Sequence, residues 1–164
     1  MITGRRLLYS SLGLVAALLV AGQAGLFAGR PPAGLGVHQD RLKPPSATPN
    51  SVSSQADMYP GHPQQAHALI EPLPLRRGDA VASVTALAAV LRATPRITLV
   101  EQRSDYLRAQ AQTRWLKFVD DLEFWFNPAT GVIELRSASR LGRQDFGANR
   151  ARIETVRAAY LAQP

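Results

Sequence analysis

The sequence predicts an α+β fold: a four-stranded antiparallel sheet made of two hairpins, with two helices on one face, preceded by an N-terminal hydrophobic helix and a linker. Two observations carry this prediction. Residues 118–126 and 132–139 alternate apolar and polar side chains around a turn-forming stretch, which is typical of a β-hairpin. Residues 79–93 and 145–161 each carry apolar side chains at helical spacing, which is typical of helices lying on a sheet.

The N-terminal region, residues 1–29, contains a stretch of 23 uncharged residues, 7–29, that follows Arg5 and Arg6. At about 1.5 Å per residue a helix of that length can cross a bilayer. Gly22 and Ala24 also supply the small residues of a signal-peptide cleavage site. We favour a retained membrane anchor over a cleaved signal peptide. Either interpretation exports the rest of the chain to the extracytoplasmic side, periplasmic or lumenal.

Residues 30–67 are rich in Pro, Gly, Ser and Gln and show no sustained periodicity, so they are interpreted as an extended linker. Within them the motif TPNSVSSQ, residues 48–55, has side chains that can hydrogen-bond nearby backbone and fix a turn. We expect this turn to dock the linker on the domain; a polar ligand loop is the alternative. His62 and His67 have no acidic partner nearby, and the chain has no cysteine, so no metal site or cofactor is expected.

The globular α+β domain is expected over residues 68–164. Residues 70–75 alternate with prolines and form at best an edge strand. Asp79 is expected to cap a helix that ends at Ala93 before Pro95. Its predicted apolar stripe consists of Val81, Val84, Leu87 and Leu91. Residues 96–103 and 106–113 then form the first hairpin.

The register of the second hairpin follows from its faces, because a slip of one residue would expose every buried side chain. Pairing Phe126 with Ile133 keeps the faces consistent around the loop 128–131. The same register sets Phe124 opposite Leu135, Leu122 opposite Ser137, Asp120 opposite Ser139 and, on the outer face, Glu123 opposite Arg136. The last pair is expected to be a surface ion pair worth about 0.2–1 kcal/mol.

The last helix is expected to begin near Asp145 as N-cap and to run to Leu161. Its predicted buried stripe consists of Phe146, Arg150, Ile153, Val156 and Tyr160. A buried arginine needs an acid, and Asp120 is the only acid that the hairpin turns inward. The sequence therefore predicts an ion pair between Asp120 and Arg150, with Asp121 on the opposite face and less important for stability.

Polar and basic side chains gather where the last strand ends and the last helix begins. Hydroxyls, guanidinium groups and a helix N-terminus are the groups that bind phosphate and carboxylate. The candidate ligand-binding residues are Ser137, Ser139, Arg140, Arg143, Asn149, Arg150 and Asp120. The competing interpretation is that these groups only satisfy one another.

Three functions remain open from the sequence. The leading one is a non-enzymatic envelope module, tethered to the membrane by its N-terminal helix and presented to a protein partner, because no nucleophile with a base is visible. The second is binding of an anionic or polar ligand at the Ser/Arg/Asn cluster. The third is a hydrolase with Asp120 and Asp121 as paired carboxylates. The formal charge is +7, but the arginines are interspersed with acids, so nucleic acid is not expected as a partner.

Four motifs in order resemble a known family: TPNSVSSQ at Thr48, FVDDLEF at Phe118, IELRSASRLG at Ile133 and DFGANRARIE at Asp145. They are similar to the uncharacterised family known as domain of unknown function 1499, and the resemblance covers residues 41–161. It implies an exported protein of the bacterial envelope or the thylakoid lumen, with no implied activity.

The chain departs from this family in one respect. Members commonly carry a pair of cysteines around the SPN-type motif, and here Ser51, Pro44 and Pro45 occupy that region. A role that depends on those cysteines does not apply to this chain.

Overall fold

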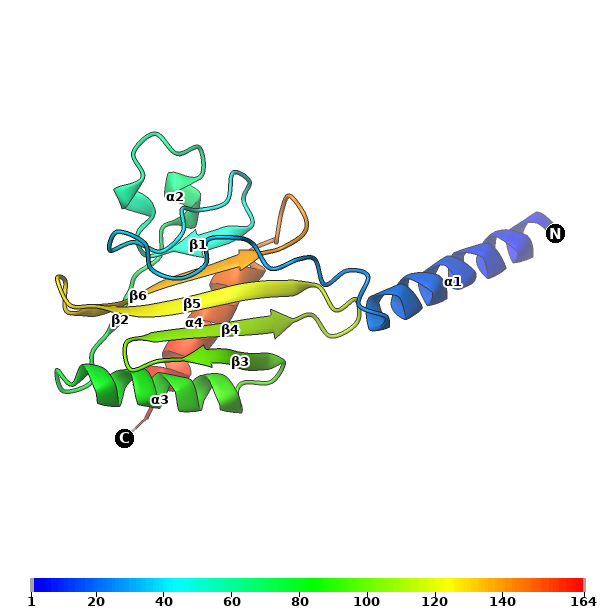
Figure 1. Cartoon of the computed structure of the whole chain (residues 1–164). Coiled ribbons are helices and arrows are strands. Elements are labelled where there is room, and N and C mark those ends of the chain that lie inside the picture. Colours follow the sequence, from blue (N-terminus) through cyan, green and yellow to red (C-terminus); the bar gives the residue numbers. More distant parts are fainter. Residues whose placement is uncertain (1, 164) are drawn as a thin grey trace.

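A six-stranded antiparallel sheet organises residues 2–163, which are the residues described by this computed structural model (Figure 1). The strands are β1 (Ser51–Ser53), β2 (Leu73–Pro74), β3 (Ile97–Gln102), β4 (Tyr106–Gln112), β5 (Val119–Asn127) and β6 (Val132–Ser139). Their order is β1-β6-β5-β4-β3, and β2 also pairs with β6. Both predicted hairpins are confirmed, as β3 with β4 and β5 with β6. Of the two strands outside the predicted four, β2 lies within residues 70–75, where at best an edge strand was expected. β1 was missed because three residues are too few to show a period of two.

The predicted register of the β5–β6 hairpin is confirmed at every position. Phe126 lies opposite Ile133, Asp120 opposite Ser139 and Glu123 opposite Arg136. Gly131, at the end of the connecting loop, has φ +69°, the left-handed conformation that glycine adopts without strain. The buried face of each strand was therefore readable from the sequence.

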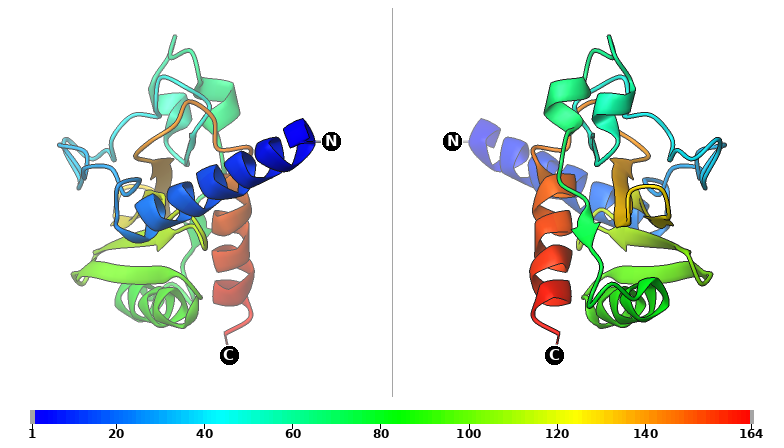
Figure 2. Two further views of the ribbon diagram at one scale, coloured as in Figure 1. Left: turned by 90° about the vertical axis from the view of Figure 1, so that its right-hand side faces the viewer. Right: turned by 90° about the vertical axis from the view of Figure 1, so that its left-hand side faces the viewer.

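Two long helices, α3 (Ala80–Ala93) and α4 (Ala148–Leu161), lie on one side of the sheet (Figure 2). The Asp79 side chain caps α3 by accepting a hydrogen bond from the backbone N–H of Ala82, as predicted. The core between helices and sheet includes the fully buried Leu87, Leu91, Leu107, Leu122, Leu135, Ile153, Val156 and Tyr160. Two shorter helical turns, Ala56–Met58 and α2 (Gln65–Ala68), precede β2.

The predicted stripe of α3 was wrong at Val81, and that of α4 was wrong at Phe146 and at Arg150, which is only partly buried. Val81 is 60% exposed because it lies in the first turn of α3, on the side away from the sheet. Phe146 is 94% exposed because α4 begins only at Ala148. Phe146 instead belongs to the turn before the helix, where its φ is +52°.

Residues 30–47, here called the strap, lie across the other face of the sheet rather than forming an extended linker. Leu42 is 1% exposed and packs with Val37 against Tyr106 and Trp125 of the sheet. The backbone N–H of Gly36 donates to Glu123 Oε1 at 2.6 Å. Beyond the strap, the TPNSVSSQ motif provides β1 at the edge of the sheet, which agrees with its expected docking role.

The N-terminal helix α1 (Ile2–Gln23) projects from one end of the sheet (Figure 1). Its segment 6–23 has a mean hydropathy of 1.4 and is only 6% buried. By length and composition it fits a membrane-spanning helix, and a signal sequence fits the same description. Its C-terminal end contacts the domain, since Gln23 Nε2 donates to the carbonyl oxygen of Trp115 at 3.1 Å. Just after the helix, the ring of Phe27 stacks on that of Phe118 with centroids 5.3 Å apart.

Candidate functional site

Three residues of the predicted ligand site meet on the helix side of the sheet. Asn149, fully buried at the start of α4, accepts a hydrogen bond from Ser137 Oγ and donates to Ser139 Oγ at 3.0 Å. The same amide donates to the carbonyl oxygen of Asn50 at 3.1 Å and to Asp145 Oδ2 at 2.8 Å. These contacts link β6, the residue before β1 and the start of α4, so Ser137, Ser139 and Asn149 of the predicted cluster hydrogen-bond to one another.

Asp145 terminates this network at the helix start. Its carboxylate accepts hydrogen bonds from the backbone N–H groups of Gly147 and Asn149, each at 3.0 Å. Burial alone would raise the pKa of this carboxyl group, but the hydrogen bonds from Asn149 and Gly147 hold the pKa below its usual value. The N-cap residue of α4 is Gly147, not Asp145 as expected. The Asp145 side chain nevertheless accepts the hydrogen bonds that an N-cap side chain would accept.

The predicted ion pair between Asp120 and Arg150 was wrong. Asp120 Oδ2 accepts from Arg152 Nη2 at 2.6 Å, whereas Arg150 donates to the carbonyl oxygens of His67 and Leu69, both at 2.8 Å. At 3.6 residues per turn, Arg150 and Arg152 flank the buried stripe of α4 on opposite sides. Arg152 lies on the side of α4 that faces Asp120 of β5. The sequence argument identified the buried stripe but assigned the ion pair to the arginine on its other side.

Arg140, another of the candidate ligand-binding residues, lies on the strap side of the sheet, away from Ser137 and Asn149. Its guanidinium makes a bidentate ion pair with Asp121, at 2.7 and 2.8 Å, and only 6% of its side chain is exposed. The hydrogen bonds to Asp121 raise the pKa of Arg140. Side chains along β6 point alternately to the two faces of the sheet, and this alternation continues to Arg140. Arg140 therefore lies on the face opposite to Ser137 and Ser139. Arg143 is exposed in the loop between β6 and α4.

The same geometry bears on the two carboxylates considered for hydrolysis. Asp120 and Asp121 point to opposite faces of the sheet, and each is held by an arginine. Paired acid and base catalysis requires both carboxylates to reach one bound substrate. The structure does not bring them together.

A second polar cluster, which the sequence interpretation missed, lies beneath the strap. Glu123 Oε1 accepts a hydrogen bond from the hydroxyl of Tyr106 at 2.8 Å in addition to that from Gly36. Glu123 Oε2 lies 3.7 Å from Arg136 Nη1, and both atoms are buried without a hydrogen-bond partner. Burial lowers the pKa of the Arg136 guanidinium, and it raises the pKa of the Tyr106 hydroxyl, with the charge of Glu123 adding to that shift.

The pairing of Glu123 with Arg136 was predicted correctly, but its burial was not. From the sequence, Glu123 and Arg136 were predicted to face solvent, because they alternate along their strands with the apolar residues of the core. The available signal lies in the strap, where Val37 and Leu42 are large apolar residues on either side of the polar stretch 38–41. The strap, which shows no periodicity, therefore buries a face of the sheet that the sequence predicts to be exposed to solvent.

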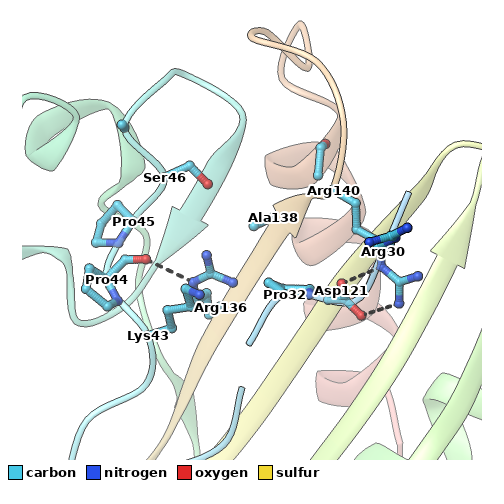
Figure 3. Close-up of a pocket in the computed structure, with 12 residues that line it drawn as sticks. Arg30, Pro32, Lys43, Pro44, Pro45, Ser46, Asp121, Arg136, Ala138 and Arg140 are labelled. Atoms are coloured by element: carbon cyan, nitrogen blue, oxygen red, sulfur yellow. Dashed lines mark hydrogen bonds and ion pairs between the residues drawn. The ribbon is translucent and has the colours of Figure 1, made fainter. Parts of the chain in front are cut away.

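Beside this cluster a cavity of about 300 Å³ opens between the strap and the sheet (Figure 3). Its charged and hydroxyl-bearing lining comes from two parts of the chain. The strap contributes Arg30, Lys43 and Ser46, and the sheet with its C-terminal extension contributes Asp121, Arg136, Ser139 and Arg140. Arg136 Nε donates to the carbonyl oxygen of Pro44 at 3.2 Å, so this guanidinium bridges the two walls. The cavity combines high positive charge with partial enclosure.

Comparison with known proteins identifies the family but no characterised relative. No curated protein and no solved structure matches the chain significantly. The model of one family, described as Protein of unknown function (DUF1499), matches residues 41–160. This range takes in the end of the strap, the whole sheet and all but the last residue of α4. The chain therefore belongs to the DUF1499 family.

Proposed function

We propose that this protein is a membrane-tethered, non-enzymatic module of the cell envelope, with its domain on the extracytoplasmic side. The observation that carries the proposal is the direct contact between the end of α1 and the β4–β5 connection. Gln23 bonds to Trp115, and a Cβ added to Gly22 would lie 2.8 Å from the backbone of Leu116. This close contact supports a domain held at the bilayer surface rather than at the end of a flexible tether.

The end of the domain next to α1 suits a membrane interface. The β4–β5 connection and the β6–α4 loop both lie at that end of the sheet (Figure 1). They expose apolar side chains, with Trp115 at 60%, Leu141 at 42% and Phe146 at 94%. The Arg114 guanidinium stacks over the Trp115 ring at 4.7 Å. Aromatic side chains with neighbouring arginines are enriched at the headgroup level of membranes.

The contacts of three buried or partly buried carboxylates support a role in interaction rather than in catalysis. Asp120 and Asp121 are each held in an ion pair by an arginine, and Asp145 accepts hydrogen bonds from two backbone N–H groups. A general acid or base would need a carboxyl group free to contact a bound substrate. We therefore favour presentation of the domain to an envelope protein, or a structural role there, over hydrolysis.

Membrane attachment is tested by fractionating cells that express the full chain. The protein is expected in the membrane fraction and to resist extraction at alkaline pH, whereas a chain lacking residues 1–29 is expected to be soluble after export by an unrelated signal. A mature native chain that begins at Gly25 would contradict the anchor. Protease added to spheroplasts should digest the domain of the full chain if it lies on the extracytoplasmic side.

The orientation of the domain is tested with single-cysteine variants, because the natural chain has no cysteine. A fluorophore on Phe146→Cys should be quenched by brominated lipids. The control is Arg77→Cys, which is exposed on the connection that precedes α3. Equal quenching at the two positions would show that this end of the domain does not face the bilayer.

A further inference from the structure

The cavity under the strap has walls from two parts of the chain that are far apart in sequence. Figure 3 shows Lys43, Pro44, Pro45 and Ser46 on one side, with Arg136 of β6 reaching across to Pro44. The Asp121–Arg140 pair lies on the other side with Arg30 beside it, and Ala138 lies between. The small side chain of Ala138 leaves the space between them open. A volume of about 300 Å³ is at the lower end of the range for ligand pockets, so it suits a small ligand or one group of a larger molecule.

The charges around the cavity do not cancel. Its lining includes four cationic side chains, Arg30, Lys43, Arg136 and Arg140, against the single carboxylate of Asp121. Asp121 is already engaged by Arg140 in a bidentate pair. Glu123, the nearest further acid, is within ion-pair distance of Arg136 but does not hydrogen-bond to its Nη1. The cavity therefore has excess positive charge that an anion would neutralise.

The buried arginine supplies an independent observation. The side chain of Arg136 is 4% exposed, it lines the cavity, and its Nη1 is buried without a hydrogen-bond partner. A buried charged donor without an acceptor costs about 1–3 kcal/mol or more, so such groups are rare unless something else binds them. On the opposite wall, Lys43 Nζ donates to the carbonyl oxygen of Ala33 and retains two further N–H donors.

From these features we infer that the cavity is a binding site for a phosphate-sized oxyanion. Arg136 and Lys43 donate to it from the two walls, Arg30 closes over it, and Arg140 adds charge while it holds Asp121. A phosphate group has enough acceptor oxygens for several guanidinium and ammonium donors at once, and arginines are the side chains best suited to it. The site shares only Ser139 with the Ser137–Asn149 cluster, and it does not depend on whether the chain is a membrane anchor.

The test is isothermal titration of inorganic phosphate into the full chain in nanodiscs of neutral lipid, with ionic strength held constant by sodium chloride. We expect saturable binding. Arg30→Gln and Lys43→Gln, each close to the surface, should raise Kd about tenfold or more, because each removes a hydrogen bond to a charged group. The paired substitution Glu123→Gln with Arg136→Gln should do the same without leaving a buried charge unpaired. The control, Arg77→Gln, should bind as the natural chain does.

A second arm distinguishes a free anion from a lipid headgroup. Nanodiscs that contain phosphatidate should abolish the phosphate titration if the headgroup occupies the cavity, and should leave it unchanged if the ligand is free in solution. Absence of phosphate binding in both kinds of nanodisc would overturn the inference and leave a water-filled cavity. Binding that survives in Arg30→Gln and in the paired variant but is lost in Arg143→Gln would also overturn it, because the site would then lie in the β6–α4 loop.

Discussion

The two faces of the sheet are both buried, but by different means. The helix face is covered by α3 and α4 and is mainly apolar, with a polar network of Asp120, Ser137 and Asn149 at one end. The strap face carries the buried acidic and basic side chains Asp121, Glu123, Glu134 and Arg136 on β5 and β6, and Arg140 directly after β6. The contrast shows that alternation along a strand identifies the apolar face of a sheet but does not reveal whether the polar face is solvated.

The two faces should also respond differently to mutation. Burial of apolar area contributes to stability in proportion to the area removed from water, at about 25 cal/mol per Å². Buried ion pairs contribute little net stability, because desolvation offsets their attraction, yet they cost several kcal/mol when one partner is removed. We therefore expect the strap face to be the more sensitive to single substitutions and the more tolerant of paired ones.

The largest effect is expected for Glu123→Ala. This change leaves Arg136 buried without its acid and removes the acceptor for Tyr106 and Gly36. We expect a loss of about 3–5 kcal/mol in the free energy of unfolding, measured by urea denaturation of the full chain in detergent. The paired change Glu123→Leu with Arg136→Met should recover most of it. A loss below about 1 kcal/mol for Glu123→Ala would show that the strap does not seal this face.

The second prediction is that Asp121→Ala lowers the free energy of unfolding more than Asp120→Ala does. The sequence alone predicted the opposite order. Asp121 is fully buried and holds both Nε and Nη2 of Arg140, so its loss should cost about 3 kcal/mol. Asp120→Ala should cost less, because Arg152 remains partly exposed at 17% and also donates to Asn149 Oδ1. Unfolding of the two variants side by side decides the order, and the opposite order would favour the original interpretation.

The third prediction concerns the apolar contact of the strap. Leu42→Ala removes a buried side chain that packs on Tyr106 and Trp125 and should destabilise by about 2 kcal/mol, the low end for such changes, because the strap can relax. Leu69→Ala, at an exposed position, should stay within about 0.5 kcal/mol. Emission from Trp125 should shift to longer wavelength only in Leu42→Ala. Equal effects of the two changes would indicate a strap detached from the sheet.

The sequence predicted what depends on local periodicity. The two hairpins, the register from Asp120 to Asn127 and the start and end of α3 all follow from alternation, helical spacing and one capping aspartate. It did not predict contacts set by segments far apart in the chain. Whether Arg150 or Arg152 reaches Asp120 depends on how α4 is rotated on the sheet, and whether Arg136 is buried depends on the strap. The cavity, which needs both walls, could not be predicted from either one.

The smallest effect is expected at Asp145, which belongs to neither face and stabilises the start of α4. Asp145→Ala removes the acceptor for the backbone N–H groups of Gly147 and Asn149 and should cost about 1 kcal/mol at pH 7, the typical value for a lost cap. Because the pKa of Asp145 is lowered in the folded state, its contribution is fully present above the unfolded pKa of about 3.9 and is lost as the pH falls through the folded pKa. The difference in unfolding free energy between the natural chain and Asp145→Ala should therefore shrink between pH 5 and pH 2, as measured in urea at each pH.

The variant Asp145→Asn, which keeps an acceptor oxygen without the charge, should lose only the pH-dependent part. A difference that stays constant over this range would mean that the charge of Asp145 does not contribute to the capping of α4.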